Sequence, residues 1–339
     1  MTYQEILANA RTCMGPYCKS CPICNGVACK NTVPGPGAKG LGTGFIRNYQ
    51  KWQELCVNMD TICENVPVDT TYSFFGKKTV LPVFAAPVGA MQLHYGDKYD
   101  DLTYNDILVT ACADAGIAAF TGDGTNPAVI QAAAEALKKN HGCGVPTIKP
   151  WNIDLVREKA ELVGAADPIA VAMDIDGAGL PFLKNLTPPA GSKTVDELRQ
   201  IAQAAGKPFI LKGIMTVSGA RKAMEAGAAG IVVSNHGGRV LDQCPATAEV
   251  LPDIADAVGG RIKVFVDGGL RTGLDVFKAL ALGADGVLIG RPFVTMVYGG
   301  GAEGVQVYVD KLQSELQDTM QMCGVHSLDE IGRDQIFRP

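Results

Sequence analysis

The segment IKVFVDGGLRTGLDVFKALALGADGVLIGRPF, residues 262–293, contains one complete example of the unit that decides the fold. Two short apolar runs, 262–268 and 285–290, each end in glycine, and an amphipathic stretch of helical period, 272–283, lies between them. This alternation is typical of parallel strands buried beneath crossover helices. The segment therefore predicts a strand–helix–strand unit.

The same unit recurs along the chain from about residue 79. Eight strand–helix units within about 260 residues have the size and rhythm of a (βα)8 TIM barrel. A doubly wound α/β sheet is the competing architecture, but the first run continues into AAPVGAMQ and not into the G-x-G-x-x-G turn of such sheets. The runs that fit buried strands are 79–86, 116–121, 144–149, 168–174, 208–213, 229–235, 262–268 and 285–290.

We expect the barrel to take residues 79–339, with its last helix at 301–324. Residues 1–78 are expected to form a Cys-rich N-terminal extension packed on the barrel, because they are too few to count as a second domain. The extension holds a cysteine cluster and a Gly-rich bend, VPGPGAKGLGTG, at 33–44.

The composition describes a large globular chain. Of its 339 residues, 47% are hydrophobic, and the formal net charge is −5. Such a chain can bury a sizeable core, and it has no basic stripe that could neutralise nucleic acid. No apolar run reaches the roughly 18 residues of a membrane span, and the start, MTYQEILANARTC, lacks the order of a signal peptide. We therefore expect a cytoplasmic protein without a nucleic-acid partner.

The carboxyl ends of the strands carry candidate catalytic residues, because active sites of TIM barrels are built there. The sixth run ends in SNHGGRVLD, where His236 can accept a proton and Arg239 can bind a carboxylate. Lys212 ends the fifth run and needs an anionic or electron-rich partner. Asp174 ends the fourth run and is expected to orient His236; a helix cap or a structural ion pair explains it equally well.

The seventh and eighth runs lead into a candidate phosphate site. VDGGLRTG (266–273) and IGRPF (289–293) supply glycine N–H groups, two arginines and the start of a helix at Thr272. Phosphate sites after strands 7 and 8 recur in these barrels, and a helix N-terminus favours an anion. Tight turns with arginines on the rim are the alternative interpretation.

Several consecutive segments closely resemble the FMN-dependent 2-hydroxy acid oxidases and dehydrogenases, such as glycolate oxidase and lactate oxidase. They are ILKGIMT, AGIVVSNHGGRVLD, PATAEVLPDI and VFVDGGLRTGLDVFKALALGADGVLIGRP, with weaker similarity in LPVFAAPVGAMQ and SLDEIGRDQI. The resemblance implies oxidation of a small 2-hydroxy carboxylate to the 2-oxo acid, with flavin as the two-electron sink. It also implies an electron acceptor, whether oxygen, a quinone or a redox protein, and a homo-oligomer, commonly a tetramer.

The resemblance assigns a role to each matching position. His236 corresponds to the catalytic base, Arg239 to the ligand of the substrate carboxylate, and Lys212 to the cation at flavin N1 and O2. Asp174 corresponds to the carboxylate that holds the histidine. The positions that match the family's FMN site are Pro87, Val88, Gly89, Lys212, Ser234, Asp267, Gly268, Gly269, Arg271, Gly290 and Arg291.

The departures from the family lie on the substrate side. The loop DIDGAGLPFLKN (174–185) lacks the usual second arginine, and Thr147 and Lys149 stand where the family has Gln and Tyr. Lys149 is a candidate substrate ligand that replaces the missing cation, or it points elsewhere. These changes leave open an FMN-dependent reductase or isomerase of another substrate. A phosphate-binding barrel without catalysis is a third reading, against which the retained Lys212, His236 and Arg239 argue.

The extension contains a candidate metal site. Cys18, Cys21, Cys24 and Cys29 include a C-x2-C-x2-C run that is similar to iron–sulfur ligation, although the full ferredoxin pattern is absent. Zinc bound by four thiolates is the second possibility, and free thiols in a reducing compartment are the third. If the extension lies over the barrel mouth, an iron–sulfur cluster there can relay electrons from the reduced flavin.

Overall fold

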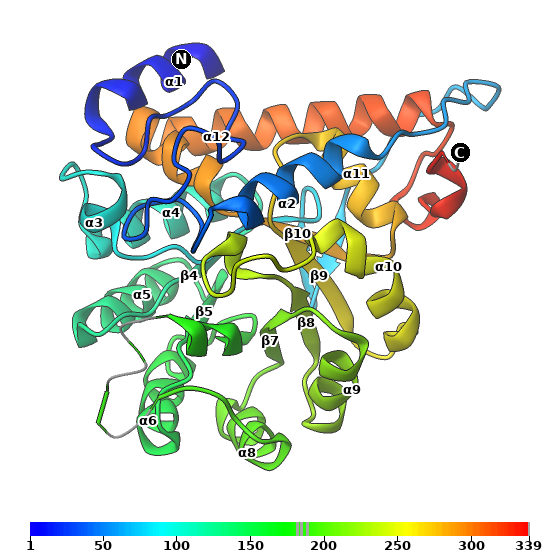
Figure 1. Ribbon diagram of the computed structural model, residues 1–339. Helices are drawn as coiled ribbons and strands as arrows, with labels where there is room; N and C mark the ends of the chain where they lie inside the picture. The colour runs from blue at the N-terminus through cyan, green and yellow to red at the C-terminus, as the bar shows by residue number, and fades with distance from the viewer. Residues whose placement is uncertain (181–182, 184–185, 188–189, 338–339) are drawn as a thin grey trace.

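The computed structural model describes residues 1–180, 183, 186–187 and 190–337. Its centre is a closed barrel of eight strands that pair in parallel in chain order, with the last strand closing against the first (Figure 1). Seven of the eight predicted strand runs contain one of them, and β7 extends one residue beyond its run of 208–213, so the TIM barrel is confirmed. The strands are β3 (Val83–Ala85), β4 (Ala118–Thr121), β5 (Gly144–Ile148), β6 (Val171–Asp174), β7 (Phe209–Ile214), β8 (Gly230–Val233), β9 (Lys263–Asp267) and β10 (Gly286–Ile289).

Helices surround the barrel and bury its outer face (Figure 1). The last helix begins at Arg291, ten residues before the predicted start at 301, because Pro292 is compatible with a first helical turn and the apolar segment after it is buried. Gly301, with φ 57° and ψ −136°, kinks it. The helices are α4 (Asp101–Asp114), α5 (Pro127–Lys139), α6 (Ile153–Gly164), α8 (Val195–Ala205), α9 (Val217–Glu225), α10 (Thr247–Val258), α11 (Gly273–Ala281) and α12 (Arg291–Met322).

The N-terminal residues pack on the barrel at the end where its strands finish. Helix α1 (Tyr3–Cys13) lies along α12, where a Cβ on Gly299 would come within 2.1 Å of the Ile6 carbonyl oxygen. Helix α2 (Thr43–Glu54) packs against the loops after β8 and β9, at the upper edge of the barrel in Figure 1, and its Trp52 Nε1 donates to the Gly268 carbonyl at 2.8 Å. These contacts make the N-terminal segment one wall of the space above the strands.

A short antiparallel hairpin, β1 (Tyr72–Phe74) and β2 (Lys77–Thr79), closes the opposite end of the barrel. The Phe74 ring lies 4.4 Å from that of Phe84 and 5.5 Å from that of Phe265, and all three side chains are fully buried. Apart from Thr79, the hairpin falls within the predicted extension, where no strand was expected.

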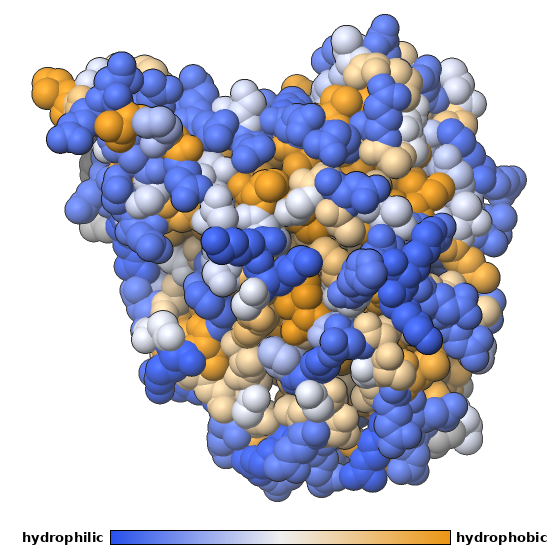
Figure 2. Space-filling view, turned by 180° about the vertical axis from the view of Figure 1, so that it is seen from behind, coloured by the Kyte–Doolittle hydropathy of each residue, from blue (hydrophilic) through white to orange (hydrophobic). Residues whose placement is uncertain are grey.

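The outer surface is mostly polar. Figure 2 shows the face opposite to that of Figure 1, where hydrophilic residues predominate and apolar ones form separate groups between them. Over the part of the chain that the structure describes, none of the helices combines the length and the apolar character that a bilayer crossing requires.

Candidate active site

A cavity of about 440 Å³ opens at the carboxyl ends of the barrel strands. It brings together predicted residues that are far apart in the sequence, from the carboxyl ends of seven of the eight strands and the loops that follow them. Ser234 lies directly behind it, where its hydroxyl accepts a hydrogen bond from Lys212 Nζ at 3.0 Å. The predicted site residues that line the cavity are Pro87, Val88, Gly89, Lys149, Asp174, Lys212, His236, Arg239, Asp267, Gly268, Gly269, Arg271, Gly290 and Arg291.

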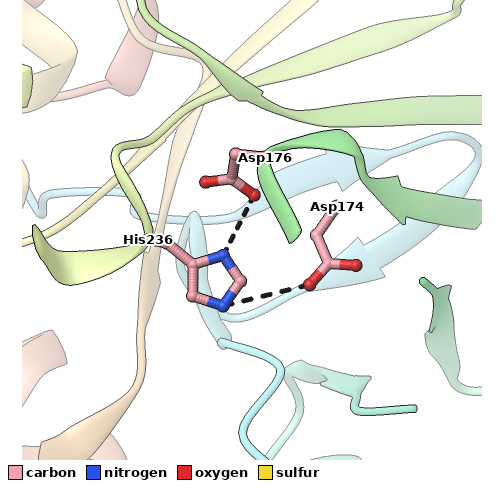
Figure 3. Close-up of side chains that lie close together, drawn as sticks. All are labelled: Asp174, Asp176 and His236. Atoms are coloured by element: carbon pink, nitrogen blue, oxygen red, sulfur yellow. Dashed lines mark hydrogen bonds and ion pairs between the residues drawn. The ribbon is translucent and has the colours of Figure 1, made fainter. Parts of the chain in front are cut away.

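The His236 imidazole lies between two carboxylates (Figure 3). Its Nδ1 is 3.0 Å from Asp176 Oδ1, and its Nε2 is 4.0 Å from Asp174 Oδ2. The hydrogen bond that was expected from Asp174 therefore comes from Asp176, which the sequence reasoning did not single out. An ionised carboxylate at Nδ1 places the ring proton there and leaves Nε2 free to accept a proton.

Backbone geometry explains why Asp176 reaches the histidine. A 3-10 turn, η1 (Ile175–Gly179), follows β6 and brings the Asp176 carboxylate to Nδ1 of His236. Gly213 makes room for it at a bulge in β7, where its φ is +101° and a Cβ would lie 2.5 Å from Asp176 Cγ. Burial works against the charge of Asp176, but His236, Lys212 and Lys149 lower its pKa, so the carboxylate stays ionised.

Asp174 forms a buried ion pair with Lys149 Nζ. Both residues line the cavity. Lys149 thus lies at the site, as its interpretation as a candidate substrate ligand requires. Its backbone is fixed by Asp123, whose Oδ2 accepts from the Lys149 N–H at 3.0 Å and from Trp151 Nε1 at 2.6 Å. Asp174 Oδ1 is buried without a hydrogen-bond partner, which leaves an acceptor in the pocket.

Lys212 supplies a buried positive charge next to these carboxylates. Its Nζ lies 3.3 Å from Asp267 Oδ2, and the side chain is only 4% exposed. Burial alone would lower the pKa of Lys212, but Asp267, Asp176 and Asp174 together raise it. The ammonium group is therefore protonated and can stabilise negative charge that develops in the cavity.

Arg239 is held by the Gly-rich bend of the N-terminal segment. Its Nη1 donates to the carbonyl oxygens of Gly35 and Gly37, the latter at 2.9 Å, while Nη2 lies 3.3 Å from Nε2 of His94. Burial and the charge of Arg291 lower the pKa of Arg239 to about 10. No sequence motif pointed to His94, which reaches the cavity from the short helix α3 (Met91–Tyr95).

The sequence pattern of the FMN-dependent dehydrogenases matches residues 36–180 and 182–338. The chain belongs to this family. The peroxisomal (S)-2-hydroxyacid oxidase of Arabidopsis thaliana is 48% identical over 144 residues, 42% of this chain and 39% of that protein. L-lactate oxidase of Lactobacillus jensenii is 46% identical over 135 residues, 40% of this chain and 33% of that protein. The aligned segments thus span between 33% and 39% of the length of these relatives.

Solved structures of the family share the fold over nearly the whole chain. A mandelate oxidase variant with a monooxide FMN adduct superposes with a TM-score of 0.74 at 28% identity, covering 89% of this chain and 92% of that one. A second mandelate oxidase variant, with 2-hydroxy-phenylacetamide, gives a TM-score of 0.79 at 25% identity and covers 99% of this chain and 97% of that one.

The cavity of this FMN-dependent dehydrogenase family member fits the cofactor that the family implies. Asp267 Oδ1 is buried and has no hydrogen-bond partner, so it can accept from a ribityl hydroxyl. Gly268 and Gly269 follow it with φ of +89° and +97°, a conformation that favours glycine and exposes backbone N–H groups. Asp267 Oδ1, a buried acceptor without a hydrogen-bond partner, thus lies beside the buried ammonium group of Lys212. This pair suits a polar, electron-accepting ring system with a hydroxylated side chain.

Arg271 and Arg291 lie at the end of the cavity expected for phosphate. Arg271 Nε donates to the Cys24 carbonyl at 2.8 Å, and Arg291 Nε to the Pro36 carbonyl at 2.7 Å. A guanidinium has five N–H donors, so both side chains keep donors for an anion. The two arginines therefore connect the N-terminal segment to the proposed phosphate site.

The helix that favours an anion differs from the predicted one. The start of α11, at Thr272, is closed by Asp275, whose Oδ2 accepts from the N–H groups of Arg271 and Thr272 at 2.8 and 3.1 Å. Helix α12 has no side-chain cap at Gly290, and its first residue lines the cavity. The positive end of α12 is therefore the one available to a phosphate.

The predicted metal ligands lie outside this cavity. Cys18, Cys21, Cys24 and Cys29 line a second cavity of about 340 Å³ on the other side of Arg271 and Arg291. None of them is in a disulfide.

Proposed function

We propose that this protein oxidises a small 2-hydroxy carboxylate to the 2-oxo acid with bound FMN. The observation that carries the proposal is the His236–Asp176 pair, 3.0 Å apart, in the same cavity as the buried Lys212 and the loops that match the family's FMN site. Two similar proteins are named as oxidases of (S)-2-hydroxy acids and of L-lactate, which supports the same class of substrate.

The residues supply what the oxidation of a hydroxyl-bearing carbon requires. FMN, when bound, accepts two electrons. His236 Nε2 takes a proton from the substrate, and the Asp176 carboxylate stabilises the imidazolium that results. Lys212 holds a positive charge at the ring side of the cavity, where Asp267 and Ser234 fix it.

His94 and Arg239 form a candidate site for the substrate carboxylate. The Gly35 N–H donates to His94 Nδ1 at 2.9 Å, which places the proton of the neutral ring on Nε2. Nε2–H and the Arg239 Nη2 donors then face each other at 3.3 Å without an acceptor between them. A carboxylate oxygen in the cavity would accept from both groups and resolve this arrangement.

An anaerobic titration tests the proposal. The purified protein is expected to show a flavin spectrum that one or more members of a panel of 2-hydroxy acids bleach. His236→Ala should retain FMN and lose this reduction. Asp176→Asn should slow it by about 100-fold or more, in line with general base catalysis. Unchanged reduction of the His236→Ala variant would refute the assignment of the base.

A second candidate is a reductase or isomerase that uses FMN with a different substrate and relays electrons through the N-terminal cysteines. It is favoured by the engagement of Arg239 Nη1 with Gly35 and Gly37 and by the absence of arginine from residues 174–185. Of that loop, residues 181–182 and 184–185 lie outside the described part of the chain. Failure of every 2-hydroxy acid to bleach a flavin that another donor reduces would favour this candidate.

Other expectations from the sequence remain predictions. They are the electron acceptor, the cytoplasmic location, a tetramer, the division of the chain between residues 78 and 79, and a metal bound by the cysteines.

A further inference from the structure

The second cavity lies between the N-terminal segment and the starts of α11 and α12. Residues 18–29 form its outer wall without regular secondary structure, and side-chain contacts fix their path. Arg11 Nε donates to the Ser20 carbonyl at 3.0 Å, and Arg271 Nε to the Cys24 carbonyl at 2.8 Å. The four cysteines of this segment, Cys18, Cys21, Cys24 and Cys29, therefore line one cavity.

The four thiols are half-buried, none of them is in a disulfide, and all four residues line the same cavity. Cysteine binds metals as the thiolate, so four thiols gathered around one cavity suit a cationic centre that they ligate together.

The surroundings of the cavity are positively charged. Arg271, Arg291, Lys19 and Lys311 line it, and Asp275, which caps α11, is its acidic residue. Arg271 Nη2 also lies 3.9 Å from Cys24 Sγ. Hydrogen bonds and positive charge next to cysteine sulfur stabilise the anionic complex that four thiolates make with a metal centre.

The spacing of the sulfur atoms favours a polynuclear centre over a single zinc ion. Zinc–sulfur bonds of about 2.3 Å keep the sulfurs of one site within about 4.6 Å of each other. Among the described residues, the one group with three potential ligand atoms within 4.8 Å of each other is Asp174, Asp176 and His236 of the active site. No three of the four cysteine sulfurs therefore lie within 4.8 Å of one another, although all four residues line one cavity of about 340 Å³.

We infer that Cys18, Cys21, Cys24 and Cys29 ligate an iron–sulfur cluster in this cavity. Cys13, the nearest other cysteine in the sequence, is not part of it: its Sγ donates to the Tyr298 carbonyl at 3.3 Å, and the residue does not line the cavity. Cys13 therefore provides a matched control.

The position of the cluster gives it a role, and this part rests on the proposed function. Arg271, Arg291 and Tyr95 line both cavities, so single side chains separate the two cavities at these positions. Oxidation of one 2-hydroxy acid to the 2-oxo acid releases two electrons and two protons. A bound cluster would carry the electrons one at a time to two equivalents of a one-electron redox protein, and the two protons would pass to solvent, one of them by way of His236.

The experiment measures iron, acid-labile sulfide and zinc in the full-length protein purified without oxygen and then reconstituted with ferrous iron and sulfide. Equal amounts of iron and sulfide are expected, with an electron paramagnetic resonance signal after reduction by dithionite. Cys21→Ser and Cys24→Ser should lose most of the iron, whereas Cys13→Ser should keep it, and FMN content reports that each variant is folded.

Zinc in place of iron would overturn the inference, and so would a number of titratable thiols that does not fall on reconstitution. Equal iron in Cys13→Ser and Cys21→Ser would also overturn it. These readouts need no substrate. If the protein holds no cluster but a 2-hydroxy acid bleaches its flavin, the cluster is refuted and the proposed function stands. If the protein holds a cluster but no 2-hydroxy acid bleaches its flavin, the cluster stands and the proposed function is refuted.

Discussion

His94 is a residue whose protonation the fold opposes. Its ring lies between the bend at residues 33–37 and Arg239, and Nδ1 accepts the Gly35 N–H. Burial, followed by the charges of Arg239 and Arg291, lowers its pKa to about 4. In the unfolded chain a histidine titrates near 6.5, so the folded protein binds fewer protons between these values. This group costs no stability above about pH 6.5, and its penalty grows as the pH falls toward 4.

We therefore expect the free energy of unfolding to fall by up to about 3 kcal/mol over this range because of His94. His94→Gln keeps an acceptor for the Gly35 N–H and removes the titration, so its stability should depend less on pH. Urea unfolding at several pH values between about 4 and 7 measures this. His141→Gln, on an exposed turn, is the control, and identical pH profiles for all three proteins would contradict the prediction.

At the same scale, the sequence could indicate which residue types form the site but not every contact between them. His236, Lys212 and Asp174 were predicted to meet at the barrel mouth, and they do. The choice between Asp174 and Asp176 depended on the 3-10 turn after β6, which DIDGAG does not reveal. His94 was missed because its position depends on contacts with Gly35 and Arg239, which are distant in the chain.

Among the elements, the bulge in β7 determines whether Asp176 can reach His236. Gly213→Ala would place a residue with a side chain at φ +101° and a Cβ 2.5 Å from Asp176 Cγ. The left-handed conformation costs about 1–2 kcal/mol, and the clash adds to it. We expect a loss of more than about 2 kcal/mol in the free energy of unfolding, with slower flavin reduction by substrate.

Gly227→Ala is the matched control for this variant. Gly227 follows α9 with φ +86°, and no atom lies within 4 Å of a Cβ built there. The free energy of unfolding of Gly227→Ala should fall only by the conformational cost of about 1–2 kcal/mol, and flavin reduction should be unchanged. Equal effects of the two substitutions on reduction would show that the clash with Asp176 is unimportant.

The elements also show where sequence patterns succeed and fail. Fully buried parallel strands read as continuous apolar runs, so all eight were found. The hairpin β1–β2 has strands of only three residues each, and its one decisive feature, Phe74 inside the barrel, is a tertiary contact. Helix α12 was predicted too short because its first turns are apolar on all sides and lack the polar face that indicates a helix.

For the whole molecule, the decisive contacts join the first fifty residues to loops near residues 240 and 290. Arg239 binds the Gly35 and Gly37 carbonyls, and Arg291 binds the Pro36 carbonyl while its guanidinium lies 3.7 Å from the Phe45 ring. No local pattern in a single sequence encodes such pairings. They make the N-terminal segment part of the cofactor cavity, because the same arginines line it.

Binding of FMN should consequently stabilise the whole fold, and its phosphate should carry much of the effect. A ligand at 100 times its Kd stabilises the folded state by about 2.7 kcal/mol. Riboflavin lacks the phosphate and would forgo charge-assisted hydrogen bonds of about 1.5–3 kcal/mol each. We expect thermal unfolding of the apoprotein to show a larger rise in Tm with FMN than with riboflavin at the same concentration. In the Arg291→Gln variant, the difference between the rise in Tm with FMN and the rise with riboflavin should be smaller, irrespective of the Tm of the variant without flavin. Equal rises in Tm with both flavins in the unsubstituted protein would place the phosphate away from Arg271, Arg291 and the start of α12.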